Sequence, residues 1–459
     1  MNYEETLEKI HSYHAFGKKP GLERITELMR ILGNPQNSLS IIHVAGTNGK
    51  GSVCRYLYCV LEQAGYACGL YTSPYLERFT ERVQFHGSQI AEEDLIRFGV
   101  PVFAAADRMQ ENGFEEPTEF DIITAIAFLY FAEKQADYVI LEVGLGGRGD
   151  STNVVSHPLA TVITSISPDH MAVLGNTLTQ IAWEKAGIAK PAVPLIYAVK
   201  DWDAAEMIRA EASKHQPPAP LYDVLGTVAP ACVSKPRSLR KKLGGYCFTS
   251  EISGYTYDTI ELSMTGMHQV ENALCALTVL ELLRSRGEFD DRGEREDWLA
   301  IVRRGMKEAT QPGRFEIISH DPVVILDGAH NEDGIRSLCR ALEDHFAGKK
   351  ILLVLGILRD KAVERILEEL KELRNSVDVA FVTTEPDSPR KMGAEELACA
   401  LREALGADCR EEREWRSAMK LAEGEAHGYD AVVFAGSLYL IGSIREGWRK
   451  EYEKSITGV

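Results

Sequence analysis

The residues best suited to chemistry follow an apolar run, Ile41–Ala45, and read Gly46-Thr47-Asn48-Gly49-Lys50-Gly51-Ser52. Glycines let backbone N–H groups converge on phosphate oxygens, and Lys50 adds positive charge at the β/γ end of a nucleotide. A helix after the loop would direct the positive end of its dipole at the same place. The spacing differs from the common pattern because Gly51 separates Lys50 from Ser52. The segment predicts a cradle for nucleotide phosphates, with an ordinary strand-to-helix turn as the alternative.

A carboxylate near the end of a second apolar run is the next candidate. Glu142 lies in Tyr138–Val143 and is followed by the glycine-rich segment Gly144–Asp150. A carboxylate at a strand end beside a phosphate loop is where Mg²⁺ is held against ATP. The alternative is a local ion pair between Glu142 and Arg148.

A third run, Thr161–Ile166, leads directly into Asp169 and His170. Carboxyl ends of parallel strands share one edge of a sheet, so we expect both residues near the phosphates. A hydrogen-bonded surface histidine is the alternative for His170. Lys185 lies in an apolar helical context, which by itself indicates only a snorkelling lysine.

The second half of the chain repeats this arrangement. The run Val324–Leu326 ends in Asp327-Gly328-Ala329-His330-Asn331, so a strand again delivers an aspartate and a histidine. Arg314 follows a Gln311-Pro312-Gly313 turn, from which it could reach a nucleotide or form a local ion pair.

Strands that alternate with helices must position these residues. Four apolar, β-branched runs in the first half are predicted strands: 40–45, 138–143, 161–166 and 195–199. Helices are predicted at 21–32, 52–64, 119–133 and 178–189. Such alternation favours right-handed crossovers and a mainly parallel sheet covered on both faces.

From about Pro217 the sequence changes to prolines, turns and short strands at 246–249 and 255–262, which predicts a small antiparallel insertion. The basic segment Lys235–Lys242 precedes it. We interpret this segment as a solvated loop, with attraction of an acidic substrate as the alternative.

A domain boundary is predicted at residues 311 and 312, after the charged stretch Arg284–Asp297 and a helix at 298–309. Beyond it, strands are expected at 323–326, 351–355, 379–383 and 431–435, with helices at 334–346, 362–373 and 394–405. The predicted class is therefore α/β: a phosphate-loop N-terminal domain (1–311) with a mainly parallel sheet and a small antiparallel insertion, then a smaller Rossmann-like domain (312–459). A groove between two such domains would suit a two-substrate reaction.

The composition of the chain limits the partners and the cellular compartment that we expect. The 459-residue chain is 45% hydrophobic and 26% charged, with a formal net charge of −17 that argues against a nucleic-acid partner. Nine cysteines without a C-x-x-C pair favour free thiols in a reducing cytoplasm. The N-terminus lacks the apolar core of a secretory signal, and the longest apolar stretch, Ile122–Ala132, is too short to span a bilayer. A cytoplasmic protein without a membrane partner is expected.

Several motifs together, in order along nearly the whole chain, resemble folylpolyglutamate synthase of the Mur ligase superfamily, whose members often also have dihydrofolate synthase activity. The resembling segments are His43–Ser52, Tyr71–Leu76, Arg78–Arg82, Glu142–Asn153, Ser167–His170, Glu184–Ile188, His268–Ala273, Pro312–Arg314 and Asp327–Asn331. This ordered set is far more specific than the phosphate loop alone.

The resemblance implies roles for individual residues. ATP would be bound by Gly46, Thr47, Asn48, Gly49, Lys50, Gly51, Ser52, Asn272, Arg314, Asp327 and His330, with Asp327 at the ribose and His330 near the phosphates. Two Mg²⁺ ions would be held by Ser73, Glu142, His170 and Lys185, the lysine being carbamylated. Lys50, Lys185 and His170 would be the catalytic residues.

The folate or pterin site implied by the resemblance comprises Thr118, Gly149, Asp150, Ser151, Arg82 and the segment Phe16–Pro20, with Ser73–Arg82 as a mobile covering loop. Two positions depart from the family pattern: Tyr75 replaces the usual histidine after Ser-Pro, and Glu332 replaces the usual proline after Ala-His-Asn. Neither departure touches the metal ligands, so the resemblance implies the activity more strongly than it implies pterin selectivity.

The implied activity is an ATP-dependent acid–amino-acid ligase. It would join L-glutamate to the carboxylate of tetrahydrofolate, and in bifunctional members also to dihydropteroate, through an acyl phosphate. The partners would be folate or dihydropteroate, L-glutamate and ATP, and the family indicates a monomer. Another Mur-type ligase acting on a cell-wall nucleotide, a P-loop kinase or GTPase and a non-catalytic nucleotide-binding protein are the alternatives.

Overall fold

The computed structural model describes residues 1–14, 21–289 and 297–457. The predicted pterin segment Phe16–Pro20 and part of the charged stretch before the boundary lie outside them. Contacts within the chain divide it into two compact units. The first contains 1–238, 248–260 and 271–309, and the second contains 239–247, 261–270 and 310–459. The second unit thus includes two short pieces from before the expected boundary.

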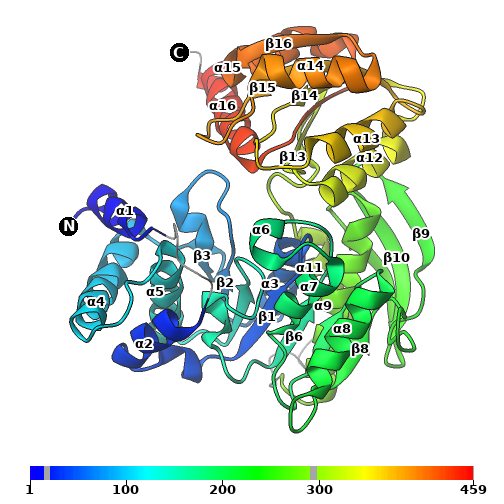
Figure 1. The fold of residues 1–459 in the computed structure, drawn as a ribbon. Coiled ribbons are helices and arrows are strands. Elements are labelled where there is room, and N and C mark those ends of the chain that lie inside the picture. The colour runs from blue at the N-terminus through cyan, green and yellow to red at the C-terminus, as the bar shows by residue number, and fades with distance from the viewer. Residues whose placement is uncertain (15–20, 290–296, 458–459) are drawn as a thin grey trace. The chain divides into compact units, whose positions relative to one another are not determined.

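An eight-stranded, mainly parallel sheet organises the first unit (Figure 1), and its strand order is β4-β3-β2-β5-β1-β6-β7-β8. Its strands are β1 (Ile41–Ala45), β2 (Cys68–Tyr71), β3 (Val83–Phe85), β4 (Ser88–Gln89), β5 (Tyr138–Glu142), β6 (Ala160–Ile163), β7 (Leu195–Tyr197) and β8 (Leu221–Asp223). The central strand β1 pairs in parallel with β5 and β6, whereas β3 and β4 are antiparallel. The carboxyl ends of β5, β1 and β6 therefore meet at one edge.

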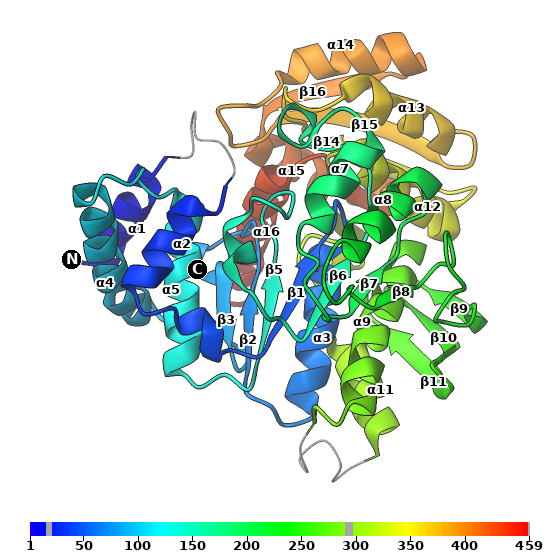
Figure 2. The same cartoon turned by 60° about the horizontal axis from the view of Figure 1, so that its bottom comes forward.

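Helices cover both faces of this sheet. They are α1 (Tyr3–Ser12), α2 (Glu23–Ile31), α3 (Lys50–Gln63), α4 (Glu92–Glu111), α5 (Glu119–Glu133), α6 (Met171–Leu174), α7 (Leu178–Ala186), α8 (Trp202–Ser213), α9 (Met267–Ser285) and α11 (Trp298–Glu308), with 3₁₀ turns η1 (Pro35–Ser38), η2 (Phe79–Arg82) and η3 (Ser151–Val154). One face packs on α3, and the other on α7 and α8 beside a group formed by α1, α2, α4 and α5 (Figure 2).

Local sequence explains where the key helices start. Thr118 caps α5, accepting from the backbone N–H of Asp121 while the Asp121 carboxylate accepts from that of Thr118. This reciprocal pair leaves two fewer unpaired N–H groups at the helix start. The helix after the phosphate loop begins at Lys50, two residues before the predicted Ser52, because Gly49 turns the chain with a φ of 86°.

The predicted antiparallel insertion is a three-stranded sheet with the order β11-β10-β9, comprising β9 (Arg237–Lys242), β10 (Gly245–Ile252) and β11 (Tyr255–Leu262). Two-residue turns join the strands, which permits only antiparallel pairing. The interpretation of the basic segment as a loop was wrong, since residues 237–242 form the edge strand β9. All six of its residues are exposed, and charged side chains on an edge strand discourage pairing with other chains.

A six-stranded sheet organises the second unit, in the order β12-β13-β17-β14-β15-β16. The strands are β12 (Glu316–His320), β13 (Val323–Asp327), β14 (Lys350–Leu355), β15 (Asp378–Glu385), β16 (Cys409–Glu414) and β17 (Ala431–Ala435). Only β12 is antiparallel to its neighbour. The helices are α12 (Glu332–Phe346), α13 (Val363–Leu373), α14 (Ala394–Leu405), α15 (Trp415–Glu425) and α16 (Leu438–Thr457), with the 3₁₀ turn η4 (Ala426–Gly428).

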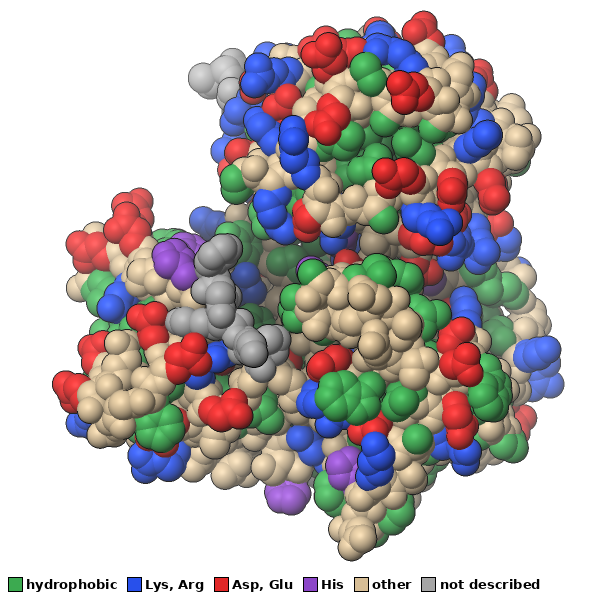
Figure 3. Space-filling view, viewed as in Figure 1, with side chains coloured by type: hydrophobic (Ala, Val, Ile, Leu, Met, Phe, Trp, Pro, Cys, Tyr) green, Lys and Arg blue, Asp and Glu red, His purple; other side chains and the backbone are tan. Residues whose placement is uncertain are grey.

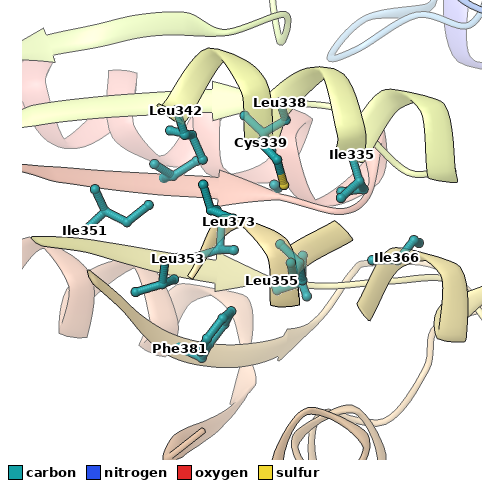
Figure 4. Packing of buried hydrophobic residues seen from close by; sticks show 14 of the residues in the cluster. Ile335, Leu338, Cys339, Leu342, Ile351, Leu353, Leu355, Ile366, Leu373 and Phe381 are labelled. Atoms are coloured by element: carbon teal, nitrogen blue, oxygen red, sulfur yellow. The ribbon is translucent and has the colours of Figure 1, made fainter. Parts of the chain in front are cut away.

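Alternating side chains of the central strands build the core of this unit. Leu353 and Leu355 of β14 point toward the helices that carry Leu338 and Ile366, and Phe381 of β15 extends the cluster (Figure 4). All five side chains are buried. Both sheets are mainly parallel with helices on both sides, so the predicted two-domain α/β class is confirmed.

Three general features accompany the fold. No helix among the described residues has the length and apolar character needed to cross a membrane. All nine cysteines lie in the described ranges and are free thiols. Acidic and basic side chains are interspersed over the face seen in Figure 3, so the net negative charge is distributed there.

Candidate active site at the phosphate loop

The loop between β1 and α3 requires glycine at two positions. Gly46 has a φ of 149°, and a Cβ there would lie 1.8 Å from the Thr164 hydroxyl oxygen. Gly49 has a φ of 86°, and its Cβ would lie 2.4 Å from the Asn272 side-chain oxygen. Asn272 thus lies directly against the loop, and its role in binding ATP stays a prediction.

The segment after β6 fixes the loop conformation. The Thr47 N–H donates to the Ser165 carbonyl at 2.8 Å, and the Asn48 N–H donates to the Ser165 hydroxyl at 3.0 Å. The Thr164 hydroxyl donates to the Asn48 carbonyl at 2.5 Å. Gly51 and the buried Ser52 form the first turn of α3. These bonds hold the loop in one shape, and a preorganised loop can bind a phosphate with little reordering.

The side-chain amines of Lys50 and Lys185 donate to the same backbone carbonyl, that of Gly46. Lys50 Nζ lies 3.2 Å from the Gly46 oxygen and 3.2 Å from the Thr47 oxygen. Lys185 Nζ lies 2.9 Å from the Gly46 oxygen. The sequence predicted a snorkelling lysine, but Lys185 is only 4% exposed and its amine points under the phosphate loop.

Burial is the larger and the positive charge of Lys50 the smaller of two causes that lower the pKa of Lys185 to about 7, against the opposing effect of Asp169, Asp150 and Glu184. Both causes disfavour the charged form of the amine. A lysine with this pKa is substantially a neutral amine at neutral pH and can act as a nucleophile.

Glu142 ends β5 as predicted, and it pairs in register with Val44 of β1. Its carboxylate is buried and accepts from the Ser73 N–H at 3.3 Å. Ser73 and Glu142 are therefore neighbours that offer a hydroxyl and a carboxylate, which are donors that Mg²⁺ prefers. Within the described residues no three His, Cys, Asp or Glu side chains form a metal-binding group, but Mg²⁺ usually needs only one or two carboxylates besides phosphate and water.

His170 is the N-cap residue of α6 and has the left-handed conformation, with a φ of 48°. Its side chain is 48% exposed, and its Nε2 lies 3.9 Å from the Asp169 carboxylate. Asp169 also accepts from the His170 N–H at 3.0 Å. The negative charge of Asp169 therefore acts on Lys185, where it raises the pKa of the amine. The ring of His170, in contrast, is about half exposed to solvent.

The alternative pairing of Glu142 with Arg148 is not what the structure contains. Arg148 instead pairs with Glu211 at 2.8 Å and stacks on Trp183, with its Cζ 3.9 Å from the ring centroid. Planar guanidinium groups stack favourably on aromatic faces. The ion-pair partner of Arg148 is thus a residue of α8 that is distant in the sequence.

The predicted folate residues of α5 and η3 form one buried hydrogen-bonded cluster. The Asp121 carboxylate accepts from the Thr118 hydroxyl at 2.8 Å and from the Ser151 hydroxyl at 2.6 Å. Arg24 pairs with Asp121 at 3.4 Å. Sequence reasoning missed Asp121 and Arg24, although an aspartate three residues after Thr118 is a capping signature that could have indicated Asp121.

Asp150 is buried, and burial raises its pKa even though several donors oppose that shift. It caps η3, accepting from the Thr152 hydroxyl at 2.5 Å and from the Leu145 N–H at 2.8 Å. The Thr152 hydroxyl also contacts His43 Nε2 at 2.8 Å. Asp150 thus holds the glycine-rich turn, which contains Gly149, in addition to its predicted pterin role.

Arg82 stands over two aromatic rings of the predicted covering loop. Its Cζ lies 5.1 Å from the Tyr75 centroid and 5.4 Å from the Phe79 centroid. Its guanidinium is also 4.0 Å from the Glu119 carboxylate. Tyr75 occupies the position that departs from the family pattern, and its aromatic ring lies against the guanidinium of Arg82.

The second unit arranges its candidates at the end of β13. The Asp327 carboxylate accepts from the N–H groups of Phe315 and Ala329, both at 2.8 Å. Burial raises the pKa of Asp327, and Arg314 opposes that shift. His330 Nδ1 lies 2.8 Å from the Gly328 carbonyl, which makes Nδ1 the protonated nitrogen. Asp327 and His330 thus come from the end of one strand, as predicted, and Arg314 lies near enough to act on the Asp327 carboxylate.

A phosphate loop, a strand-end carboxylate and a second α/β unit define a ligase of the Mur class. The family model of the Mur ligase middle domain matches residues 44–280, and that of the Mur ligase glutamate ligase domain matches residues 313–438. The chain is 37% identical to the dihydrofolate synthase/folylpolyglutamate synthase of Bacillus subtilis over 97% of this chain and 98% of that protein.

Solved structures agree with this match. Folylpolyglutamate synthase of Mycobacterium tuberculosis with ADP and AMPPCP has a TM-score of 0.83 and 30% identity, covering 97% of this chain and 98% of that one. A folylpolyglutamate synthase complex with AMPPCP and folate has a TM-score of 0.81 and 31% identity, covering 98% and 100%. This chain belongs to the folylpolyglutamate synthase family.

Proposed function

We propose that the chain is an ATP-dependent ligase that joins L-glutamate to the carboxylate of a folate. The observation that carries this proposal is the placement of Lys50 and the buried Lys185 on the Gly46 carbonyl of a preorganised phosphate loop. The names of the full-length relatives, a dihydrofolate synthase/folylpolyglutamate synthase among them, support the choice of folate as substrate. The solved complex with AMPPCP and folate supports the pairing of a nucleotide with that substrate.

The proposed reaction has two steps. A folate carboxylate oxygen attacks the γ-phosphorus of ATP, and the bond to the β–γ bridging oxygen breaks, giving an acyl phosphate and ADP. The amino group of L-glutamate then attacks the acyl carbon; phosphate leaves and the nitrogen loses a proton, giving an amide. The protein's main task is to neutralise anions that approach each other, which suits Lys50 and, in the second unit, Arg314.

We propose that two Mg²⁺ ions assist, held by Ser73, Glu142, His170 and Lys185. The contact between Ser73 and the Glu142 carboxylate supports this donor set. Bound there, Mg²⁺ would supply neutralisation of phosphate charge and in-line orientation.

Lys185 is proposed to carry a carbamate. Its neutral amine would attack CO₂, forming an N–C bond and releasing one proton, and the product would be an anionic metal ligand. The pKa of about 7 supports this step, since about half of the amine is neutral at pH 7, against roughly one part in a few thousand for an ordinary lysine.

Thr118, Gly149, Asp150, Ser151 and Arg82 are proposed to bind the pterin part of the substrate. The burial of Asp121 among Thr118 and Ser151 supports a polar, shape-defined pocket rather than a charged surface. Dihydropteroate is proposed as a second acceptor, following the double name of the Bacillus subtilis relative. We further propose a cytoplasmic monomer, consistent with nine free cysteines.

The ATP contacts are proposed to come from both units: Gly46–Ser52 and Asn272 from the first, and Arg314, Asp327 and His330 from the second. The C-terminal domain, 312–459, would then close over ATP and glutamate. This closure would exclude water from the acyl phosphate, which water would otherwise hydrolyse.

Glutamate-dependent phosphate release tests the function directly. The purified chain should release phosphate from ATP with tetrahydrofolate and glutamate, and also with dihydropteroate and glutamate. A muramyl nucleotide should give no release above the rate without acceptor. Release with the muramyl nucleotide alone would identify another Mur-type ligase, and acceptor phosphorylation without amide formation would indicate a kinase.

A further inference from the structure

Arg148 contacts the last turn of α7, the helix that carries Lys185. Its backbone N–H donates to the Glu184 carbonyl at 2.8 Å. Its guanidinium donates to the Trp183 carbonyl at 3.1 Å and lies over the Trp183 ring, with Cζ 3.9 Å from the centroid. One residue of the glycine-rich loop thus makes three separate contacts with the last turn of α7.

The last turn of a helix needs such partners. The final four carbonyls of an α-helix have no N–H donor within the helix, and α7 ends at Ala186 with Gly187 as its C-cap. Arg148 satisfies two of these carbonyls and places a positive charge at the negative end of the helix dipole. Removing the guanidinium would leave the Trp183 carbonyl without this donor and loosen the turn.

The glycine-rich loop and the C-terminal end of α7 are also closely packed against each other. A Cβ at Gly187 would lie 2.4 Å from Cβ of Arg148, and a Cβ at Gly147 would lie 2.9 Å from the Lys185 carbonyl oxygen. Asn153 Nδ2 donates to the Arg148 carbonyl at 3.0 Å and to the Gly187 carbonyl at 3.1 Å. These contacts transmit the position of Arg148 to the helix end.

A second helix holds the outer end of the guanidinium. Nη2 of Arg148 lies 2.8 Å from the Glu211 carboxylate of α8, and Glu211 is 9% exposed at its side chain. Hydrogen bonds between two charged groups are shorter and stronger than those between neutral groups. Arg148 is therefore fixed from one side by α8 and acts on α7 from the other.

We propose that Arg148 is a positioning residue for Lys185. Lys185 belongs to the turn that Arg148 holds, and its amine reaches the Gly46 carbonyl from there at 2.9 Å. A small rotation of that turn would displace the amine from the phosphate loop. The lysine side chain is almost completely buried, so it cannot take another path to the same carbonyl. This inference rests on the proposed function only for the catalytic use of Lys185.

The test compares R148M and R148K with R209M. Arg209 lies on α8 and pairs with Glu206 of the same helix, so R209M removes an exposed arginine ion pair from within α8. R148M should lower kcat about tenfold or more, as loss of an outer partner of a metal ligand does, with KM for ATP unchanged. R148K keeps the charge but not the planar stacking, so its loss should be intermediate.

Two readouts do not depend on turnover. Backbone amide exchange at residues 187–189 should accelerate in R148M, because their N–H groups donate to the carbonyls of residues 184–186. Labelling of Lys185 by an amine-reactive reagent at a fixed pH should also be faster, because the amine leaves its buried position. Neither should change in R209M.

The bicarbonate dependence of activity separates positioning from general destabilisation. R148M should need more bicarbonate for half-maximal activity, whereas a merely structural loss would lower the unfolding temperature and leave that dependence unchanged. Unchanged exchange at 187–189 and unchanged labelling of Lys185 in R148M would overturn the proposal. If K185A were fully active, the proposed role of Lys185 would fail, while the exchange and labelling arms would still decide what Arg148 positions.

Discussion

Lys50 and Lys185 donate to one backbone carbonyl, that of Gly46, from residues 135 positions apart in the chain. The two amines approach from α3 and from α7, so the phosphate loop has a lysine at its helical end and another beneath it. Two positive charges at one acceptor oppose each other, which is one reason why the pKa of Lys185 falls. The same arrangement becomes favourable when anionic phosphate is bound.

Replacing Gly46 by alanine should disable the loop. The added Cβ would lie 1.8 Å from the Thr164 hydroxyl oxygen, so the loop must move, and a displacement of about 1 Å can cost about 100-fold in turnover. Steady-state kinetics should show a raised KM for ATP as well. G33A is the matched control, because Gly33 also has a positive φ, of 85°, but an added Cβ would have no atom within 4 Å. Equal kinetic losses in both variants would contradict this account.

The buried amine should make stability depend on pH. An unfolded lysine keeps its proton up to about pH 10.5, whereas folded Lys185 keeps it only up to about 7. The unfolded chain therefore binds more protons between these values, and this group makes the folded state more stable as pH rises. K185M lacks the group, so it should be more stable than the wild type near pH 6.

That advantage should be a few kcal/mol at low pH and should shrink as pH rises toward 10.5. Urea unfolding of both proteins in CO₂-depleted buffer at several pH values would measure it. K420M, which removes an exposed lysine, is the control and should show no such trend. Parallel curves for K185M and the wild type would rule out a strongly perturbed amine.

The carbamate proposal predicts chemical rescue. K185A should lose turnover because a metal ligand is missing, and added short carboxylates such as acetate should partly restore it by occupying the space of the carbamate. K50A should not respond to the same carboxylates, since it lacks a cation rather than an anion. Full activity of K185A without additives would refute the proposal.

Ser151 links the proposed pterin pocket to fold stability. S151A removes a donor at 2.6 Å from the buried Asp121 carboxylate, which should cost about 1–3 kcal/mol of unfolding free energy. KM for the folate should rise while KM for ATP stays the same. S213A is the control, because the Ser213 hydroxyl donates to a carbonyl on an exposed helix surface. A parallel rise in both KM values would argue against a pterin-specific role.

Domain closure predicts compaction on ligand binding. Small-angle scattering should show a smaller radius of gyration with AMPPCP and folate together than with either one. Compaction is expected because the residues proposed to contact ATP lie on both units. An unchanged radius in the presence of both ligands would count against closure.

Local sequence predicted the elements around the site with small errors. The helix predicted at 119–133 has the bounds of α5, whose long apolar run, Ile122–Ala132, is flanked by the charged residues Asp121 and Glu133. The strand ending at Glu142 was predicted one residue too long. The basic strand β9 was missed because its side chains are all exposed and carry no alternation between apolar and polar residues.

Partners of charged side chains were much harder to predict. The sequence placed Arg148 six residues from Glu142 and made a local pair plausible, but Arg148 pairs with Glu211 instead. Sequence distance carries no information about such a choice, since it depends on how α8 packs against α7. The same holds for Asp121, whose donors Ser151 and Arg24 come from two other elements.

The sequence by itself determined the phosphate loop, because glycine spacing and a strand-to-helix transition are local properties of Gly46–Ser52. It also determined the family, through motifs kept in order along the chain. Only the tertiary structure decided that Lys185 is a buried amine with a pKa of about 7 rather than a surface cation. Burial and the field of Lys50 arise when α7 docks beneath the loop, and neither exists before the chain folds.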